Sequence, residues 1–234
     1  MARILFLHGL ESGPQGTKVH LLRDQGIEVV APDQRMSLRR LDRDNSVARN
    51  LMRDNEVRLA AATTAAGLLA APWRRGALAL AAAGIGWGVV RHRRWIASAT
   101  ATSRRACAQI AAEALHARPD VLVGSSWGGA VACQLIADGS WTGPTILLAP
   151  ASRKVQGVID PAGWTSLADR IMANPEPVHI VHDPADDVVP VGGSRDLTGG
   201  SVTLHEVNAG GHRLLPFVED GRLAELIRSL APSS

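Results

Sequence analysis

One short segment, residues 124–129, constrains the fold of this chain more than any other. It reads Gly-Ser-Ser-Trp-Gly-Gly, and it joins an apolar run at 121–124 to helix-forming residues at 128–137. The string Gly-x-Ser-x-Gly is common by chance. Between a strand and a helix, however, its glycines permit the sharp turn that lifts the central serine out of a sheet. The segment therefore predicts a strand–turn–helix unit.

The central serine of this turn is Ser126, because Gly124 and Gly128 stand two positions away on either side of it. Ser125 lacks that spacing. A helix that begins directly after the serine favours negative charge beside its hydroxyl. We therefore predict Ser126 as a nucleophile.

Apolar runs and helix-forming stretches alternate along most of the chain. Strands followed by helices predict an α/β protein with a mostly parallel sheet that carries helices on both faces. In such sheets the functional side chains gather at the carboxyl ends of the strands. The predicted strands are 4–7, 27–31, 121–124, 145–148, 178–182 and 202–207; the predicted helices are 17–25, one that runs to about Pro119, 128–137, 165–173, a short one near Ser194, and 217–230.

A serine hydroxyl needs a base to become nucleophilic at neutral pH, and the base needs a carboxylate to fix its tautomer. His212 follows the last predicted strand in a Gly-rich loop that could deliver an imidazole to the edge of the sheet. The loop after the strand at 178–182 contains three aspartates, of which we prefer Asp186 to Asp187 as the acid. The resulting order of Ser, Asp and His along the chain is the one found in α/β hydrolases.

An oxyanion that forms during acyl transfer is stabilised by two fixed backbone N–H groups. One is expected from Trp127, directly after the nucleophile. The other is expected from Leu10, which follows His8 and Gly9 at the end of the first strand. His8, like His182 at the end of a later strand, is predicted to support the site rather than to react.

These segments resemble the small bacterial α/β hydrolases, a family of esterase-like serine hydrolases. The likeness rests on residues 4–14, 124–129, 186–190 and 211–213 and covers about 2–35 and 103–232. Many members have His-Gly where this chain has His182-Asp183. The resemblance implies an α/β-hydrolase fold, a triad of Ser126, Asp186 and His212, and hydrolysis of carboxylic esters through an acyl-enzyme. It implies no cofactor and no metal.

Residues 36–102 interrupt the core that we expect to consist of 1–35 and 103–234. We interpret this insertion as a helical, Ala- and Arg-rich cap or lid. Residues 33–105 contain 14 of the 25 basic residues but only 5 of the 22 acidic ones. Two apolar arms, 59–73 and 76–90, would each span roughly 22 Å as helices, which is short of a bilayer core of about 30 Å.

Three interpretations of the insertion stay open. It could cover the site and form the acyl pocket, it could form a homodimer interface, or residues 59–95 could dip into a membrane surface. In the membrane interpretation, tryptophans lie at the interface and arginines face anionic headgroups. Nucleic acid is not an expected partner, because the Arg-rich segment has no binding motif and few aromatic residues.

The sequence therefore predicts a carboxylesterase that acts on small-molecule acyl esters. The alternatives are a lipase or thioesterase acting on lipid-like acyl substrates at a membrane surface, and a non-catalytic binding protein with the same fold. Two cysteines, Cys107 and Cys133, are too few for a disulfide framework. The apolar run at 4–7 is too short for a signal peptide. We expect a cytoplasmic protein, or one peripheral to the inner face of the membrane.

Overall fold

The computed structural model describes residues 1–10, 12–35, 62 and 75–232. The chain divides into two compact units, one formed by Met1–Ser37 and Ala101–Ser234 and the other by Leu38–Thr100. The first predicted arm, 59–73, lies outside the described residues except for residue 62. The role of the insertion as a cap therefore stays a prediction.

The first unit is built on one sheet of six strands in the order β2-β1-β3-β4-β5-β6. Every neighbouring pair of strands is parallel, which confirms the predicted sheet. β2 lies on one side of β1, whereas β3 to β6 follow one another on the other side. The direction in which strands are added to the sheet therefore reverses between β1 and β3. The strands are β1 (Arg3–Leu7), β2 (Glu28–Val30), β3 (Val121–Ser125), β4 (Thr145–Leu148), β5 (Val178–His182) and β6 (Val202–Glu206).

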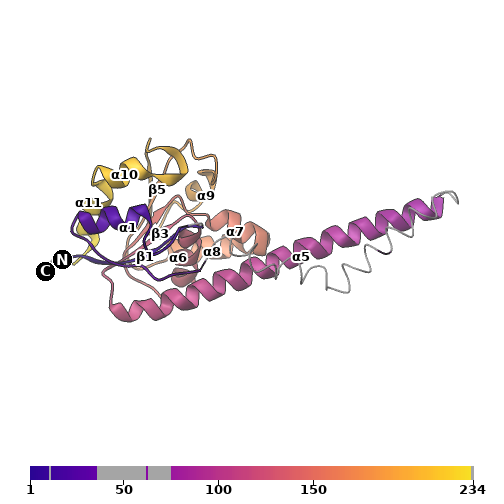
Figure 1. Cartoon of the computed structure of the whole chain (residues 1–234), viewed down its shortest axis with the longest axis horizontal. Coiled ribbons are helices and arrows are strands. Elements are labelled where there is room, and N and C mark those ends of the chain that lie inside the picture. The colour runs from indigo at the N-terminus through magenta and orange to yellow at the C-terminus, as the bar shows by residue number, and fades with distance from the viewer. Residues whose placement is uncertain (11, 36–61, 63–74, 233–234) are drawn as a thin grey trace. The chain divides into compact units, whose positions relative to one another are not determined.

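Helices cover both faces of this sheet (Figure 1). One face packs against α1 (Thr17–Asp24), α10 (Leu215–Glu219) and α11 (Arg222–Leu230). The other packs against α6 (Trp127–Ala137), α7 (Ser152–Ile159), α8 (Trp164–Met172) and the last turns of α5 (Arg75–Ala114). The remaining described elements are α9 (Gly192–Arg195), η2 (Leu115–Ala117), η3 (Pro161–Gly163) and η4 (Gly211–Arg213).

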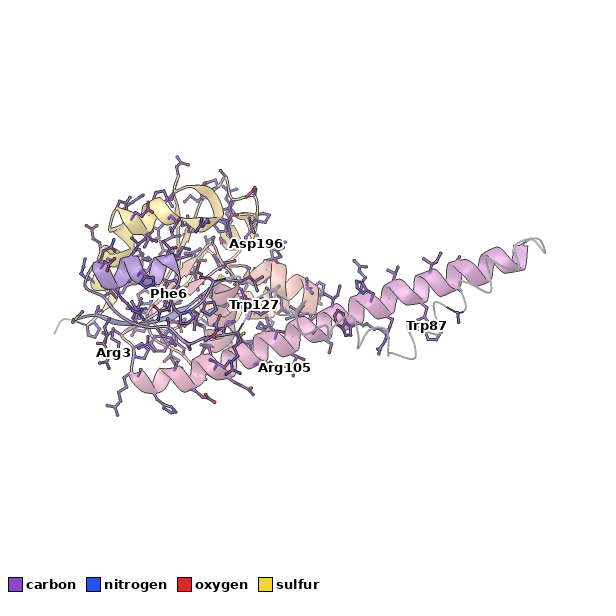
Figure 2. All side chains as sticks on the ribbon, viewed as in Figure 1. Arg3, Phe6, Trp87, Arg105, Trp127 and Asp196 are labelled. Carbon is purple, nitrogen blue, oxygen red and sulfur yellow. The ribbon has the colours of Figure 1, made fainter. Side chains whose placement is uncertain are left out.

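Alternation along the strands divides the core into two layers, because successive side chains of a strand point to opposite faces. Ile4 and Phe6 pack with α1 and α11, whereas Leu5 and Leu7 pack with α6. Phe6 and Trp127, both labelled in Figure 2, are buried in this unit. Strands buried on both faces read as continuous apolar runs, which explains why the sequence revealed them.

Two helix predictions were wrong in detail, and one helix was missed. The segment 217–230 is not one helix, because Gly221 adopts φ +85° and separates α10 from α11. The arm 76–90 is not separate from the helix predicted to run to about Pro119, because α5 continues through both to Ala114 in a stretch that contains no proline. The helix α7 was not predicted. At 1.5 Å per residue, the 40 residues of α5 extend about 60 Å.

Among the described helices, none combines the length and the apolar character needed to cross a bilayer. Although α5 is long, its sequence is interrupted by Arg91, Arg93 and Arg94.

Candidate active site

Ser126 lies at the turn between β3 and α6 with a backbone conformation that side chains rarely adopt. Its φ is +54° and its ψ is −112°, and such strain costs on the order of 1–3 kcal/mol. The surrounding backbone holds it in place: its N–H donates to the Leu148 carbonyl at 2.9 Å, and its carbonyl accepts from Ala151 at 3.0 Å and Ala130 at 3.2 Å. The strain identifies the turn as a specialised position rather than an ordinary loop.

The glycines beside Ser126 are required by close packing. A Cβ atom at Gly128 would overlap the backbone of Leu7 in β1, and one at Gly124 would lie 2.7 Å from the Gly128 carbonyl oxygen. Real Cβ atoms essentially never approach so closely. The pattern read from the sequence therefore corresponds to a helix start that is pressed against the neighbouring strand.

Ser126, His212 and Asp186 form one hydrogen-bonded chain. His212 Nε2 lies 2.9 Å from Ser126 Oγ, and His212 Nδ1 lies 2.7 Å from Asp186 Oδ2. A carboxylate can only accept, so Nδ1 carries the proton and Nε2 is left to accept from the Ser126 hydroxyl. The structure thus brings together the three residues that the sequence selected from separate loops.

Asp186 is buried, whereas Asp187 is exposed. The other oxygen of Asp186, Oδ1, accepts hydrogen bonds from the N–H groups of Val188 and Val189, both at 2.9 Å. Burial alone would raise the pKa of Asp186, but the hydrogen bonds from Val189, His212 and Val188 outweigh it, and the pKa lies below its ordinary value. Asp186 is therefore held as a carboxylate that faces His212.

Asp183 has a structural role that the sequence did not reveal. Its Oδ2 accepts from the N–H groups of Ala209 at 2.9 Å and Gly211 at 2.8 Å, and its Oδ1 accepts from Ala185 at 2.8 Å. The backbone hydrogen bonds from Gly211 and Ala185 are the main reason why the pKa of Asp183 is lowered. This carboxylate therefore fixes the loop that carries His212. The only sequence signal was an acidic residue directly after a buried strand.

His182 is fully buried and braces the loop of Asp186. Its Nε2 lies 2.9 Å from the Val189 carbonyl oxygen and 3.2 Å from Asp186 Oδ2, and both of these atoms are acceptors, so Nε2 carries a proton. Its Nδ1 lies 2.7 Å from Ser194 Oγ in α9. His182 does not reach Ser126; it contacts the acid instead, as a supporting residue would.

The loop after β1 lies against Ser126. A Cβ atom at Gly9 would be 3.3 Å from the Cβ of Ser126. His8 is buried: its Nδ1 lies 2.9 Å from the Gly9 carbonyl oxygen, and its Nε2 accepts from the N–H of Gln34 at 3.2 Å. The C=O and N–H of a trans peptide point in opposite directions. His8 therefore fixes the direction of the Leu10 N–H by holding the Gly9 carbonyl.

Trp127 is the first residue of α6, so its backbone N–H has no acceptor within the helix. This N–H directly follows Ser126 and starts the helix whose N-terminus favours negative charge. Trp127, at the start of α6, and Leu10, in the loop after β1, thus both lie beside Ser126.

Ser126 and His212 open into one cavity of about 790 Å³. Residues 9, 10 and 12–16 and the first turn of α1 form most of its wall, and Arg213 and Leu215 complete it on the side of His212. A cavity of this size accommodates a small organic substrate. Among the described residues, no group of three or more His, Cys, Asp and Glu side chains is arranged to hold a metal ion.

Comparison with solved structures places this architecture among known folds. A protein of Thermus thermophilus matches over 99% of this chain and 90% of its own, with a TM-score of 0.54 and 15% identity. A protein of Xanthomonas campestris pv. campestris assigned to the alpha/beta hydrolase superfamily matches over 98% of this chain and 100% of its own, with a TM-score of 0.48 and 22% identity. The esterase domain of a Rhodothermus marinus protein covers 51% of this chain and 66% of its own, with a TM-score of 0.40 and 17% identity.

No family model matches the chain, and no curated protein matches it in sequence. The six-stranded parallel sheet, the helices on both its faces and the serine turn between β3 and α6 define the α/β-hydrolase fold. The chain has this fold, as its sequence predicted.

Proposed function

We propose that the protein is a serine hydrolase that cleaves carboxylic esters through an acyl-enzyme on Ser126. The observation that carries this proposal is the unbroken chain of hydrogen bonds from Asp186 through His212 to Ser126. A nucleophile within hydrogen-bond reach of a base, with the base oriented by a third group, is the arrangement that acyl transfer requires.

In the first half of the reaction, Ser126 Oγ attacks the carbonyl carbon of the ester, and its proton passes to His212 Nε2. The tetrahedral intermediate then collapses, the bond from carbon to the alcohol oxygen breaks, and His212 returns the proton to the leaving alkoxide. Asp186 stabilises the imidazolium that exists between these two transfers. The products of this half are the free alcohol and an ester of Ser126.

In the second half, His212 takes a proton from water as the water oxygen attacks the acyl carbon. Collapse of the second tetrahedral intermediate breaks the bond to Ser126 Oγ, which regains its proton from His212. The carboxylic acid leaves and the enzyme is restored. In both halves, the proton transfers involve only side chains of this chain, the substrate and water.

The backbone N–H groups of Leu10 and Trp127 are the proposed donors to the oxyanion of both intermediates. Fixed donors of this kind are each worth roughly 2.7–4 kcal/mol of transition-state stabilisation. His8 is a positioning residue in this proposal, because its hydrogen bond to the Gly9 carbonyl oxygen orients the Leu10 N–H.

The experiment that tests the proposal combines a fluorophosphonate probe with a short p-nitrophenyl ester. We expect the probe to label Ser126 in the folded protein, and we expect Ser126→Ala to abolish both labelling and turnover while Ser125→Ala retains labelling at Ser126. Circular dichroism checks that each variant keeps the fold. If folded wild-type protein shows neither labelling nor turnover, the non-catalytic binding protein becomes the better description.

A second candidate function is a lipase or thioesterase that acts on lipid-like acyl chains at a membrane surface. It is favoured by large apolar side chains that are exposed on α5 in the stretch before Arg91, namely Ile85, Trp87, Val89 and Val90. A panel of acyl chain lengths with and without anionic vesicles distinguishes it from the first candidate. A gain in rate with long chains and vesicles favours the lipid substrate; equal rates favour small esters.

A further inference from the structure

The cavity beside Ser126 contains two cationic side chains, Lys18 and Arg213, that the proposed reaction does not use. We propose that they bind an anionic group of the substrate, so that the esters cleaved by this enzyme carry a carboxylate or a phosphate in addition to the scissile bond. This inference rests on the proposed function, because it places the anionic group in the same cavity as Ser126.

Lys18 has a neutral hydrogen-bond partner. It lies in the first turn of α1, and its Nζ donates to the hydroxyl of Ser125 at 2.9 Å. Ser125 is 7% exposed and precedes the proposed nucleophile in the chain. The lysine ammonium is therefore tied to the residue next to Ser126 by a contact that leaves its charge uncompensated.

Arg213 follows His212 in η4 and lines the same cavity as Lys18. The two cations repel each other: burial, and to a smaller extent the charge of Arg213, together lower the pKa of Lys18 to about 8. The repulsion between the positive charges of Lys18 and Arg213 thus costs free energy. A bound anion would offset that cost by compensating both charges at once.

No described residue that lines the cavity is an aspartate or a glutamate. Other cations of this unit do have carboxylate partners: Arg3 pairs with Glu28, Arg195 with Glu206 and Arg222 with Asp220. Asp183 and Asp186, which lie near the loop of His212, direct their oxygens toward backbone N–H groups and His212. Within the described residues, the cavity is therefore a cationic site without an internal counter-ion.

The start of α1 adds to the positive electrostatic potential in the cavity. Gly16, Thr17 and Lys18 line the cavity, the helix has no acidic residue in its first turn, and its N-cap has no side-chain hydrogen bond. The positive end of the helix dipole therefore faces the cavity with no carboxylate of its own helix to complement it. Guanidinium, ammonium and a helix N-terminus all suit carboxylates and phosphates.

The cavity of about 790 Å³ is far larger than a single inorganic ion needs. Because Ser126 and His212 share it with the two cations, one molecule can present its ester to Ser126 and its anionic group to Lys18 and Arg213. The class of substrate that fits is an ester with a second, negatively charged end.

The test compares anionic esters with neutral esters of similar size. On the acyl side, p-nitrophenyl hemiglutarate is compared with methyl p-nitrophenyl glutarate. On the alcohol side, the butyrate esters of 4-hydroxybenzoate and of 4-hydroxyphenyl phosphate are compared with that of methyl 4-hydroxybenzoate. We expect kcat/KM to favour at least one anionic ester over its neutral partner by roughly tenfold or more, the size of a charged hydrogen bond.

The variants are Lys18→Met, Arg213→Gln and their combination. Arg170→Gln is the control, because it removes one positive charge from the exposed side of α8, outside the cavity. We expect Lys18→Met to lower the ratio of anionic to neutral kcat/KM about tenfold and the double variant to abolish the preference. Arg170→Gln should change the ratio less than twofold. Absence of an anionic preference in an active wild-type enzyme, or its survival in the double variant, overturns the proposal.

A binding measurement separates this proposal from the proposed reaction. Ser126→Ala protein is titrated with the butyrate ester of 4-hydroxybenzoate and with its methylated partner by calorimetry. Binding of the anionic ester that is lost with Lys18→Met supports the subsite even where no ester is turned over. Equal affinity for both esters overturns the subsite even where Ser126 proves to be a nucleophile.

Glu11 requires its own variant, because this acid belongs to the loop at 9–16 and lies outside the described residues. If Glu11 neutralised Lys18, Glu11→Gln would raise the anionic preference and Lys18→Met would leave it unchanged, which would contradict the proposal. We expect Lys18→Met to lower the preference in both the wild-type and the Glu11→Gln background.

Discussion

The carboxylate of Asp183 accepts a hydrogen bond from the backbone N–H of Gly211 at 2.8 Å, one residue before the proposed base. The same oxygen accepts from Ala209 at 2.9 Å. A single buried carboxylate at the end of β5 thus sets the position of a loop that belongs to the chain after β6. This explains how a Gly-rich segment can present His212 in a fixed orientation.

We predict that Asp183→Asn destabilises the fold by about 1–3 kcal/mol, because an amide N–H₂ placed toward a backbone N–H leaves a buried donor unsatisfied. The pKa of Asp183 is lowered in the folded state. Its contribution to stability is therefore full above its ordinary pKa and is lost as the pH falls through the folded value. Thermal unfolding should show the largest difference between wild type and variant at neutral pH and a smaller one below about pH 4.

The matched control for this prediction is Asp138→Asn, on an exposed turn where the carboxylate accepts only from Ser140. We expect its melting temperature to match that of the wild type closely. A melting difference for Asp183→Asn that did not shrink at acid pH would contradict the role assigned to the carboxylate.

Asp186 and Asp187 offer a pair of adjacent acids with different surroundings. Asp186→Asn should reduce kcat for a p-nitrophenyl ester by several orders of magnitude, because an amide cannot hold the Nδ1–H tautomer of His212; the corresponding loss in another triad is about 10⁴. Asp187→Asn, whose side chain is exposed, should change kcat less than twofold. Steady-state kinetics measure both. A large loss in Asp187→Asn with a small one in Asp186→Asn would reverse the assignment.

The sequence could not decide between these two aspartates on physical grounds. Both follow the same strand, and neighbouring residues of a loop can point in opposite directions. The backbone N–H groups of Val188 and Val189, which both donate to Asp186, determine which of the two aspartates faces His212. Such a loop geometry has no simple sequence signal. Asp183 was missed for a similar reason, because its partners lie 26 and 28 residues further along the chain.

The turn at Ser126, by contrast, was predictable, because its signal is local. A strand, a Gly-x-Ser-x-Gly string and a helix follow one another within a few residues, and the buried strands are continuous apolar runs. Helix ends were harder to predict. Gly221 breaks the last helix, whereas several glycines within α5 do not break that helix, so a glycine alone does not determine where a helix stops.

Gly128→Ala tests the packing that the turn requires. A Cβ at this position would overlap the Leu7 backbone, and backbone cannot move aside as a flexible side chain can. We predict a loss of about 3 kcal/mol or more, or failure to fold. Gly157→Ala is the control, because Gly157 lies on the exposed side of α7 with nothing near the added methyl. It should be neutral or stabilise by up to about 1 kcal/mol. Urea unfolding measures both, and equal effects would argue against the close approach of α6 to β1.

The lowered pKa of Lys18 predicts how the anionic preference depends on pH. The ammonium form binds an anion and the neutral amine does not, so the contribution of Lys18 is full below about pH 8 and declines as the pH rises through that value. Arg213, the other charge that faces Lys18, sustains part of the preference. The profile of kcat/KM reports the free enzyme, so a bound anion does not displace the transition. We therefore expect the ratio of kcat/KM for anionic and neutral esters to fall between about pH 7 and pH 9.

In Lys18→Met the ratio of kcat/KM for anionic and neutral esters should be low and flat over the same range, and in Lys18→Arg it should stay high at pH 9. Because both esters share the same nucleophile and base, the effect of pH on the reaction itself cancels in the ratio. A fall in the ratio that persisted in Lys18→Met would have to come from a group other than Lys18.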